Sequence, residues 1–348
     1  MFGRCIRAFL PFLLLATTAP AQNQKLSLVK SFNLSPDIAG KLSISTKNEI
    51  WCGAHGDLLL PIEHGRFMDQ RLVKVSSTGK VLARINVDSV PGFAKSNVVE
   101  FGLAPSGNVY VLAARVTFER VDRRKKGEVT GWSQTLEKDT WVLVFNGDGN
   151  FHSIARLSMP LYVTAMAPLG PSNLLVVGHK YSTGEINIPF AGVFTRLGEL
   201  VKEINLPDDL QREEVRGEYY AMGEVRIRTL VDGSVYLQTG RYFPKLSVIA
   251  PTGEVVSSVR LELPDEIEDL WMQQFSDGEM AAAAIAKNLD NAFVTFDSAT
   301  GKLARRFELQ NPPLEKFSYA GFLACYKQNL FTFVSHDQNR LEIFAPGR

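Results

Sequence analysis

Short apolar runs separated by tight polar turns recur along this chain. Five segments read as an apolar run, a glycine-containing turn and a second apolar run: RLVKVSSTGKVLARINV, WVLVFNGDGNFHSIARL, AGVFTRLGELVKEINL, LSVIAPTGEVVSSVRL and AFVTFDSATGKLARRFEL. A sixth copy, RLEIFAPGR, starts at Arg340 and stops just past its turn, and KLSLVKSFNL, residues 25–34, has the pattern of the missing second run. Such pairs of runs are typical of antiparallel β-hairpins.

A second hairpin precedes each of these pairs. Its outgoing strand follows a polar turn and begins at Asn48, Gly107, Ser172, Gly233, Gly278 and Gln328. Four strands per unit, repeated six times, predict an all-β fold, a six-bladed β-propeller with four-stranded antiparallel blades. Residues 25–34 are expected to complete the last blade and close the ring. A β-sandwich is the alternative, but it does not explain why the last repeat is truncated.

Residues 1–21 have the features of an export signal. Arg4 and Arg7 precede an apolar stretch, and the small residues Ala19 and Ala21 suit a cleavage site. The apolar stretch is shorter than the roughly 20 residues that span a bilayer, and we expect no transmembrane anchor in the mature chain. The predicted domains are therefore a signal peptide, 1–21, and a single propeller, 22–348, located in a periplasm or secreted, which we expect to be a monomer.

Charge and cysteine content narrow the function classes. Without Arg4 and Arg7, 36 basic residues stand against 37 acidic ones, a balance that argues against nucleic acid or an anionic membrane as partner. Cys52 and Cys325 both remain in the mature chain. They are expected in the first and last blades, where a disulfide would fasten the ring; two buried free thiols are the alternative.

The turn phrases APTGEVV, SSTGKVL and SATGKLA resemble those of six-bladed propellers of the NHL-repeat and TolB-like type. The resemblance covers the mature chain from 22 to 348 and is one of repeat shape. The WD dipeptide of WD40 blades is absent from the sequence.

Cationic or imidazole side chains recur just past the outgoing strand of every predicted blade. They are His55, Arg115, His179, Arg241, Lys287 and His336. If these positions share one rim of the ring, they form an electropositive ring that binds an anionic ligand near the central channel. The alternative is that basic residues are ordinary at strand ends.

Oxygen-bearing side chains occupy a second shared position, near the start of the predicted inner strands. They are Asn97, Glu224 and Asp269. Sugar lactonases of similar propeller architecture hold calcium with a Glu, an Asn and an Asp, so the resemblance implies a possible calcium site here. The alternative reading is that these residues are polar loop ends.

The most basic run of the chain, residues 120–126, is expected to form a hairpin extension that covers a ligand, touches a partner or is simply a solvated tip. No GxSxG motif or phosphate-binding glycine loop occurs. The sequence therefore favours a non-catalytic exported binding protein for a protein, peptide or glycan. A metal-assisted hydrolase or lyase of the sugar-lactonase type is the alternative.

Overall fold

The computed structural model describes residues 23–39, 42, 50–53, 55–64, 69–93, 96–125, 128–182, 185–205, 225–239, 244–265, 267–276, 279–286, 291–309, 321–335 and 339–347. Regular structure within these ranges consists of strands and one short 3₁₀ turn, η1 (Val87–Ser89). None of the described segments forms a helix with the length and apolar character needed to cross a bilayer.

Hydrogen bonds group the strands into five sheets. Four sheets contain four antiparallel strands each, in chain order. The first sheet contains β2 (Trp51–Cys52), β3 (Leu58–His64), β4 (Asp69–Val75) and β5 (Val81–Ile85). The second contains β6 (Asn97–Leu103), β7 (Val109–Lys125), β8 (Glu128–Phe145) and β9 (Phe151–Arg156).

The third sheet contains β10 (Leu161–Leu169), β11 (Asn173–Ser182), β12 (Glu185–Thr195) and β13 (Leu200–Glu203). The fourth contains β14 (Arg226–Thr229), β15 (Val235–Thr239), β16 (Lys245–Ile249) and β17 (Val255–Arg260). The fifth sheet has eight strands, in the spatial order β18 (Ile267–Ser276), β19 (Glu279–Ala286), β20 (Asn291–Asp297), β21 (Leu303–Leu309), β1 (Asn23–Asn33), β24 (Arg340–Pro346), β23 (Leu330–Ser335) and β22 (Gly321–Lys327).

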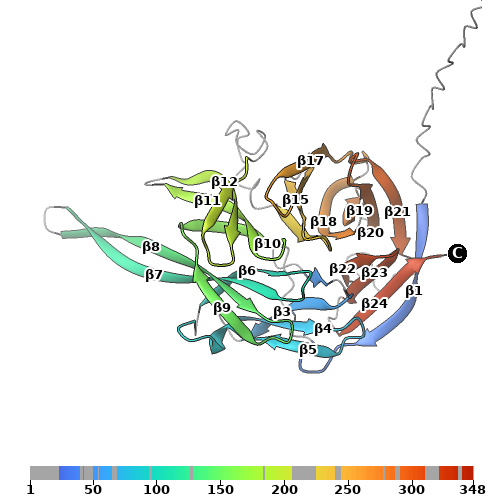
Figure 1. Ribbon diagram of the computed structural model, residues 1–348, viewed down its shortest axis with the longest axis horizontal. Helices are drawn as coiled ribbons and strands as arrows, with labels where there is room; N and C mark the ends of the chain where they lie inside the picture. Colours follow the sequence, from blue (N-terminus) through green and yellow to red (C-terminus); the bar gives the residue numbers. More distant parts are fainter. Residues whose placement is uncertain are drawn as a thin grey trace, which may run out of the picture.

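The sheets are arranged around a common centre (Figure 1). Strands β2, β6, β10, β14, β18 and β22 contact one another in that order, and β22 contacts β2. The protein is therefore an all-β propeller with four-stranded antiparallel blades. The sequence predicted six separate blades, whereas hydrogen bonding gives five sheets, because β1 pairs in parallel with β21 and so joins the last two groups of strands.

Burial along the strands follows their position in each blade. All five residues of β15, the second strand of the fourth sheet, are buried. In β17, the outermost strand of the same sheet, exposed residues alternate with half-buried ones. An interior strand is covered on both faces and reads as a continuous apolar run, whereas an edge strand keeps one face in water and alternates.

All five glycine-turn hairpins predicted from the sequence are confirmed as antiparallel strand pairs. In each turn the glycine has a positive φ, between 73° and 86°, a conformation that favours glycine. The glycine amide donates to the carbonyl of the residue that begins the turn, as Gly79 does to Ser76 at 2.9 Å. These turns therefore need glycine because other residues rarely adopt this positive φ.

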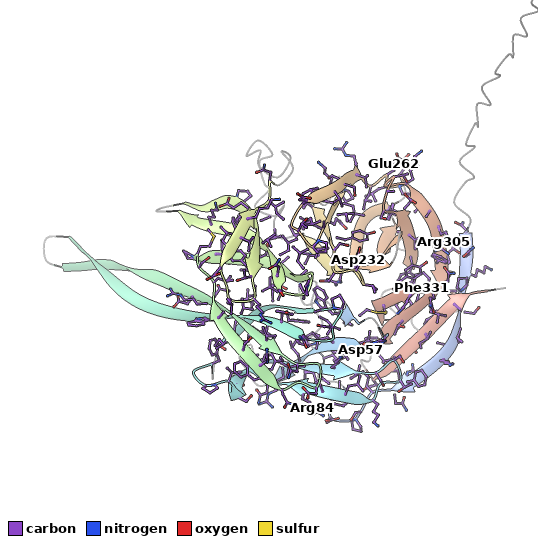
Figure 2. The ribbon with its side chains drawn as sticks, in the orientation of Figure 1. Asp57, Arg84, Asp232, Glu262, Arg305 and Phe331 are labelled. Atoms are coloured by element: carbon purple, nitrogen blue, oxygen red, sulfur yellow. A yellow bond between two sulfur atoms is a disulfide. The ribbon has the colours of Figure 1, made fainter. Side chains whose placement is uncertain are left out.

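Four of these glycines also dock one blade onto the preceding one. A Cβ on Gly198, in the β12–β13 turn, would lie 2.0 Å from the carbonyl oxygen of Arg156, the last residue of β9. Equivalent close approaches join Gly149 to Arg84, Gly301 to Arg260 and Gly79 to Asn33, with Cβ–oxygen distances of 2.7, 2.0 and 2.8 Å. In these four cases a carbonyl near the end of one strand thus abuts the turn of another sheet, and Figure 2 shows Arg84 and Glu262 at the outer rim where such strand ends lie.

β1 lies between β21 and β24 in the eight-stranded sheet. Its antiparallel ladder runs from Leu26–Pro346 to Asn33–Arg340, with a bulge at Val29. Leu34, just after β1, donates its amide to Asn339, just before β24, as Leu157 does to Thr140 and Leu261 does to Pro244 around the other outer strands. The segment 25–34 is therefore paired with β24, although the chain does not connect the two strands through a turn.

A disulfide joins the first sheet to the eight-stranded one. Cys52 in β2 is bonded to Cys325 in β22, with a Cα–Cα distance of 5.3 Å and 273 positions between them in the sequence. Of the two alternatives left open by the sequence, the structure has the disulfide and not a pair of free thiols.

The predicted register of the first blade is wrong by one strand. The segment beginning at Asn48 was expected to be a second strand, but Trp51–Cys52 forms the first strand, β2, and Leu58–His64 forms the second. Gly53 and residues 55–57 lie between the two strands. The Gly53 amide donates to the carbonyl of Asp57 at 2.7 Å, and Gly56 has φ 78°. The connection between β2 and β3 is tight because Gly56 supplies the positive φ that such a turn needs.

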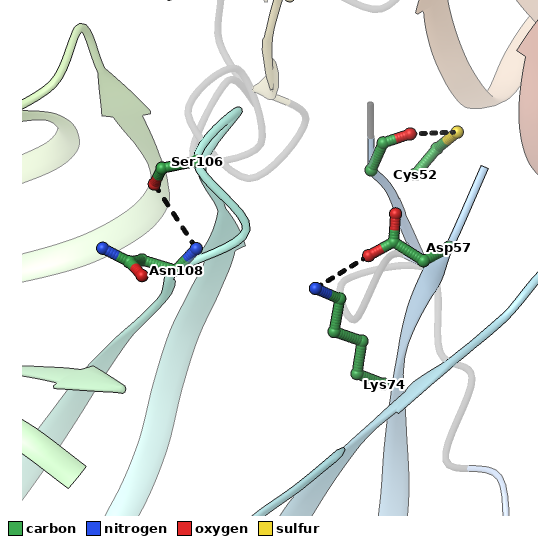
Figure 3. Close-up of polar contacts among 6 residues, drawn as sticks. Cys52, Asp57, Lys74, Ser106 and Asn108 are labelled. Carbon is green, nitrogen blue, oxygen red and sulfur yellow. Dashed lines mark hydrogen bonds and ion pairs between the residues drawn. The ribbon is translucent and has the colours of Figure 1, made fainter. Parts of the chain in front are cut away.

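A buried ion pair supports the junction between the first and second sheets. Lys74 in β4 and Asp57 lie 2.9 Å apart, and each side chain is only 11% exposed (Figure 3). The Lys74 ammonium also lies beside the β6–β7 turn, since a Cβ on Gly107 would be 3.3 Å from Nζ. The side chain thus connects a strand of one blade to a turn of the next.

Candidate binding site at the base of a β-hairpin arm

Connections along an antiparallel blade alternate between its two ends, so the β7–β8, β11–β12 and β9–β10 connections lie at one end. Of these, the β7–β8 hairpin is by far the longest, with strands of 17 and 18 residues. It confirms the hairpin extension predicted around residues 120–126.

The outer part of this hairpin is a two-stranded ribbon. The neighbouring strands end early: β6 pairs with β7 only as far as Ala114, and β9 pairs with β8 only from Trp141 onward. Residues 115–125 and 128–139, which we call the arm, continue as a ladder of two strands alone and project from the ring (Figure 1). The two residues between these segments lie outside the described part of the chain.

A depression of about 300 Å³ lies at the base of the arm. It is formed by Asp139 and Thr140 of β8 and by residues 156–160, which lead from β9 into β10. Asp139 and Arg156 form an ion pair there, with side chains 43% and 61% exposed. Because both charges remain in contact with water, the pair contributes little to stability and its partners are accessible.

Two hydrogen bonds fix the backbone around this depression. The Leu157 amide donates to the Thr140 carbonyl at 2.9 Å, and the Ser158 amide donates to the carbonyl of Gly198 in the next blade at 2.7 Å. The Ser158 hydroxyl accepts the Leu200 amide at 3.1 Å. The depression is therefore built on two blades that are docked together by the glycine turn described above.

The predicted ligand residue Arg115 is placed beside this site by its backbone. It is the first residue of the arm in β7, opposite Asp139 in the ladder. His179 lies in β11 of the next blade, opposite Tyr162, and the two rings are 6.3 Å apart. Partial burial lowers the pKa of His179 from its ordinary value, which favours the neutral imidazole. Arg115 and His179 therefore belong to adjacent blades at the end that carries the arm.

Lys180, next to His179, is engaged in contacts within its own blade. Its ammonium lies 2.6 Å from a carboxylate oxygen of Glu203 in β13 and 5.1 Å from the centroid of the Phe190 ring. Its charge is therefore largely compensated, and it contributes little to an electropositive rim.

The other predicted members of the ring are not brought together by the described structure. His55 is exposed in the β2–β3 turn, which lies at the opposite end of the blade from the β7–β8 and β11–β12 connections. This placement follows from the one-strand correction to the first blade. Arg241, Lys287 and His336 lie outside the described residues. The anionic-ligand hypothesis for this ring stays a prediction.

The proposed calcium ligands also stay a prediction. Asn97 is the first residue of β6, Asp269 lies near the start of β18, and Glu224 is outside the described residues. In the described ranges, no three His, Cys, Asp or Glu residues are grouped as metal ligands. A calcium-dependent rise of the melting temperature would support the metal hypothesis, because a metal bound only by the folded state must stabilise it.

Sequence reasoning missed the residues that fill the centre of the ring. The guanidinium of Arg228 in β14 lies 4.8 Å from the centroid of the Trp51 ring in β2, and both residues are 4% exposed. A Cβ on Gly102 would meet Pro168 at 2.6 Å and Trp51 at 3.4 Å. Residues from four sheets pack together here. The hypothesis of an anionic ligand near the central channel therefore needs a site outside this packed layer. The glycine inside the strand EFGLAP was the available signal, since glycine in a strand indicates a close approach.

Comparisons with known proteins give the fold and no family. No protein-family model and no curated protein match this chain. A protein of unknown function from Dyadobacter fermentans is similar over 92% of this chain and 99% of its own, with 11% identity and a TM-score of 0.51. The WD40 domain of Neurospora crassa Pan2 is similar over 93% and 97%, with 11% identity and a TM-score of 0.47. A protein of unknown function from Bacteroides caccae is similar over 75% and 80%, with 13% identity and a TM-score of 0.43. At these identities the likeness to the Dyadobacter structure supports the propeller fold alone.

Proposed function

We propose that this protein is an exported, non-catalytic binding protein that holds a protein, peptide or glycan at the end of the propeller from which the arm projects. The observation that carries the proposal is the arm itself. An isolated two-stranded ribbon is marginally stable in water, so a long one is better explained by a partner that covers it than by a solvated loop.

The register of the arm supports a binding role. Val116 and Lys138, Phe118 and Leu136, and Asp122 and Trp132 are cross-strand partners. Alternation in a strand puts these three pairs on one face of the ribbon. These positions include Phe118 and Trp132, and aromatic residues are enriched in protein interfaces. In the sequence, the basic run 120–126 lies toward the far end of the arm.

The propeller of this proposal has six blades, and β1 closes the ring as the fourth strand of the last one. Support comes from the antiparallel ladder of β1 with β24 and from the Gly79–Asn33 contact, which repeats the Gly149–Arg84 contact between successive blades. Six blades and the turn phrases make the NHL-repeat or TolB-like type the assignment that we propose.

Export is the location that we propose, in a periplasm or outside the cell. The Cys52–Cys325 disulfide supports it, because disulfides persist mainly in oxidising compartments. The leader-like residues 1–21 lie outside the described part of the chain.

An arm-shortened variant tests the binding role. Residues 118–136 are replaced by an Asn-Gly turn that connects the cross-strand partners Thr117 and Glu137. Wild type, this variant and a control altered at the other end, Val231→Ser in the β14–β15 turn, are immobilised and exposed to an extracellular protein fraction and to a glycan array. The proposal expects ligands that the wild type and the control retain and the shortened variant loses.

Equal retention by all three proteins would overturn the proposal. Arg115→Ala, at the first position of the arm, should weaken retention while preserving the fold. Turnover assays on lactones and phosphate esters should remain blank with every variant, and hydrolysis that depends on added calcium would favour the hydrolase instead.

A further inference from the structure

The depression at the base of the arm combines two opposite charges with an apolar wall. Arg156 and Asp139 lie together in it, and each keeps about half of its side chain in water. An exposed ion pair is worth no more than about 1 kcal/mol, so a ligand that replaces it loses little. The two charges cancel, and the site therefore offers no preference for a simple anion or a simple cation.

The polar groups beside this pair have unused hydrogen-bonding capacity. Thr140 is 3% exposed, and its buried hydroxyl has no hydrogen-bond partner. Other atoms cover this hydroxyl, so a ligand in the depression does not contact it. The Ser158 hydroxyl accepts the Leu200 amide, which leaves its own proton available for a carboxylate.

The rest of the lining is apolar and small. Leu157 is buried, whereas Met159 and Pro160 are partly open to the depression. A volume of about 300 Å³ is at the lower end of ligand pockets and suits a compact molecule with a short aliphatic group. Met adapts its shape to such groups because its side chain is unbranched and flexible.

We propose that the depression binds a zwitterionic α-amino acid with an aliphatic side chain, a small ligand that the protein binds in addition to the partner of the arm. The carboxylate pairs with Arg156 and the Ser158 hydroxyl, and the ammonium pairs with Asp139. The side chain packs on Met159 and Pro160. A peptide terminus carries only one of the two charges next to its side chain and binds more weakly.

Calorimetric titration of the full chain with L-leucine, at millimolar concentration, tests this assignment. N-acetyl-L-leucine, which lacks the ammonium, and L-leucinamide, which lacks the carboxylate, are the matched ligands. Each is expected to bind about tenfold more weakly, because each loses one charge-assisted interaction. Arg156→Gln and Asp139→Asn should weaken the binding of L-leucine by a similar factor, and Thr140→Val should leave it unchanged because the Thr140 hydroxyl is covered.

Testing the variants with the modified ligands shows whether Asp139 binds the ammonium group of the amino acid. Asp139→Asn should not weaken N-acetyl-L-leucine further, because that ligand has already lost the ammonium. Arg84→Gln is the control variant, since Arg84 pairs with Asp37 at similar exposure in another blade and does not line the depression. It should bind L-leucine as the wild type does.

The outcomes separate this inference from the proposed function. No heat with L-leucine, or equal affinity for the three ligands, overturns the amino-acid site. If arm-dependent retention of a partner persists in that case, the binding role of the arm stands without it. Tighter binding of L-leucinyl-glycine than of L-leucine would also overturn the zwitterion assignment, in favour of a peptide amino terminus.

Discussion

The β16–β17 pair and the β24–β1 pair are both antiparallel, but only the first is joined by a turn. β16 and β17 pair through five residue pairs and are linked by the APTG turn. β24 and β1 pair through seven and lie at opposite ends of the chain. β1 also pairs in parallel with β21 through four more residue pairs. The strand that lacks a covalent turn thus has the longer ladder and a second neighbour.

A tight turn keeps two strands at high local concentration, whereas distant segments must close a long loop first. The pairing of β1 bears that entropic cost. The Cys52–Cys325 bond offsets part of it on the inner side of the same region, and the aromatic cluster of Phe293, Phe307, Phe331 and Phe333 packs with Leu26 of β1. Strands held only by pairing therefore need more contacts than strands joined by a turn.

Removing β1 should have the largest effect on the stability of this region. Deletion of residues 25–34 should abolish the cooperative thermal transition, because it exposes the edges of β24 and β21 and removes the buried Leu26 from the aromatic cluster. Circular dichroism and light scattering on heating measure the result. Deletion of residues 1–21 alone is the control and should leave the transition intact.

A synthetic peptide of residues 23–34 tests whether β1 is held in the fold by strand pairing alone. If β1 is held by strand pairing, the peptide added to the truncated protein should restore a cooperative transition. A truncated chain that melts as the wild type does would show that β1 is not part of the stable fold.

Loss of the disulfide is expected to have the next largest effect. Cys52→Ser with Cys325→Ser should lower the free energy of unfolding by about 2–5 kcal/mol, because the bond closes a very long loop in the unfolded chain. Urea unfolding with and without reductant measures it. Reductant should destabilise the wild type and leave the double variant unchanged; equal sensitivity of the two proteins would mean that the bond does not form.

The regular repeats were readable from the sequence, and the exceptions were not. The hairpins were found because an apolar run, a glycine turn and another apolar run are local signals. The first blade was misread because β2 has only two residues, Trp51 and Cys52, too few for a periodicity. The pairing of β1 with β24 was found from a missing repeat, but its pairing with β21 leaves no trace in either strand.

The candidate site was found only in part, for a related reason. Arg115 and His179 come from a shared position in the repeat, and they do lie in adjacent blades at one end. Arg156 and Asp139 meet because β9 returns beside β8, and their charges carry no pattern along the chain. Arg228 and Trp51 meet across the centre of the ring, a contact between distant strands that no local spacing encodes.

Two glycines with the same backbone conformation test the docking of blades at turns. Gly198 has φ 79° and would place a Cβ 2.0 Å from the Arg156 carbonyl oxygen, whereas Gly56 has φ 78° and would meet only Ser77 Cβ at 3.8 Å. Gly56→Ala should cost about 1 kcal/mol for the left-handed conformation alone. Gly198→Ala should cost about 2 kcal/mol more, because the blades must move apart.

Urea unfolding of the two alanine variants gives both values. The matched φ removes the conformational term from the difference, so the remainder reports the close approach between blades. Equal costs for the two variants would mean that the turn glycines serve only the turn and not the junction.

The smallest expected effect concerns His179, which ties the stability of the third blade to pH. Burial lowers its pKa in the folded protein, while the unfolded chain keeps a pKa of about 6.5. Between these two values the unfolded state binds more protons, so stability falls as pH decreases below about 6.5 and levels off once the folded state is protonated as well. His179→Gln removes the titrating group and should flatten this part of the profile of unfolding free energy against pH. An unchanged slope in that variant would assign the acid sensitivity to other groups, whereas a flattened one locates it beside Tyr162, at the end of the propeller that carries the arm.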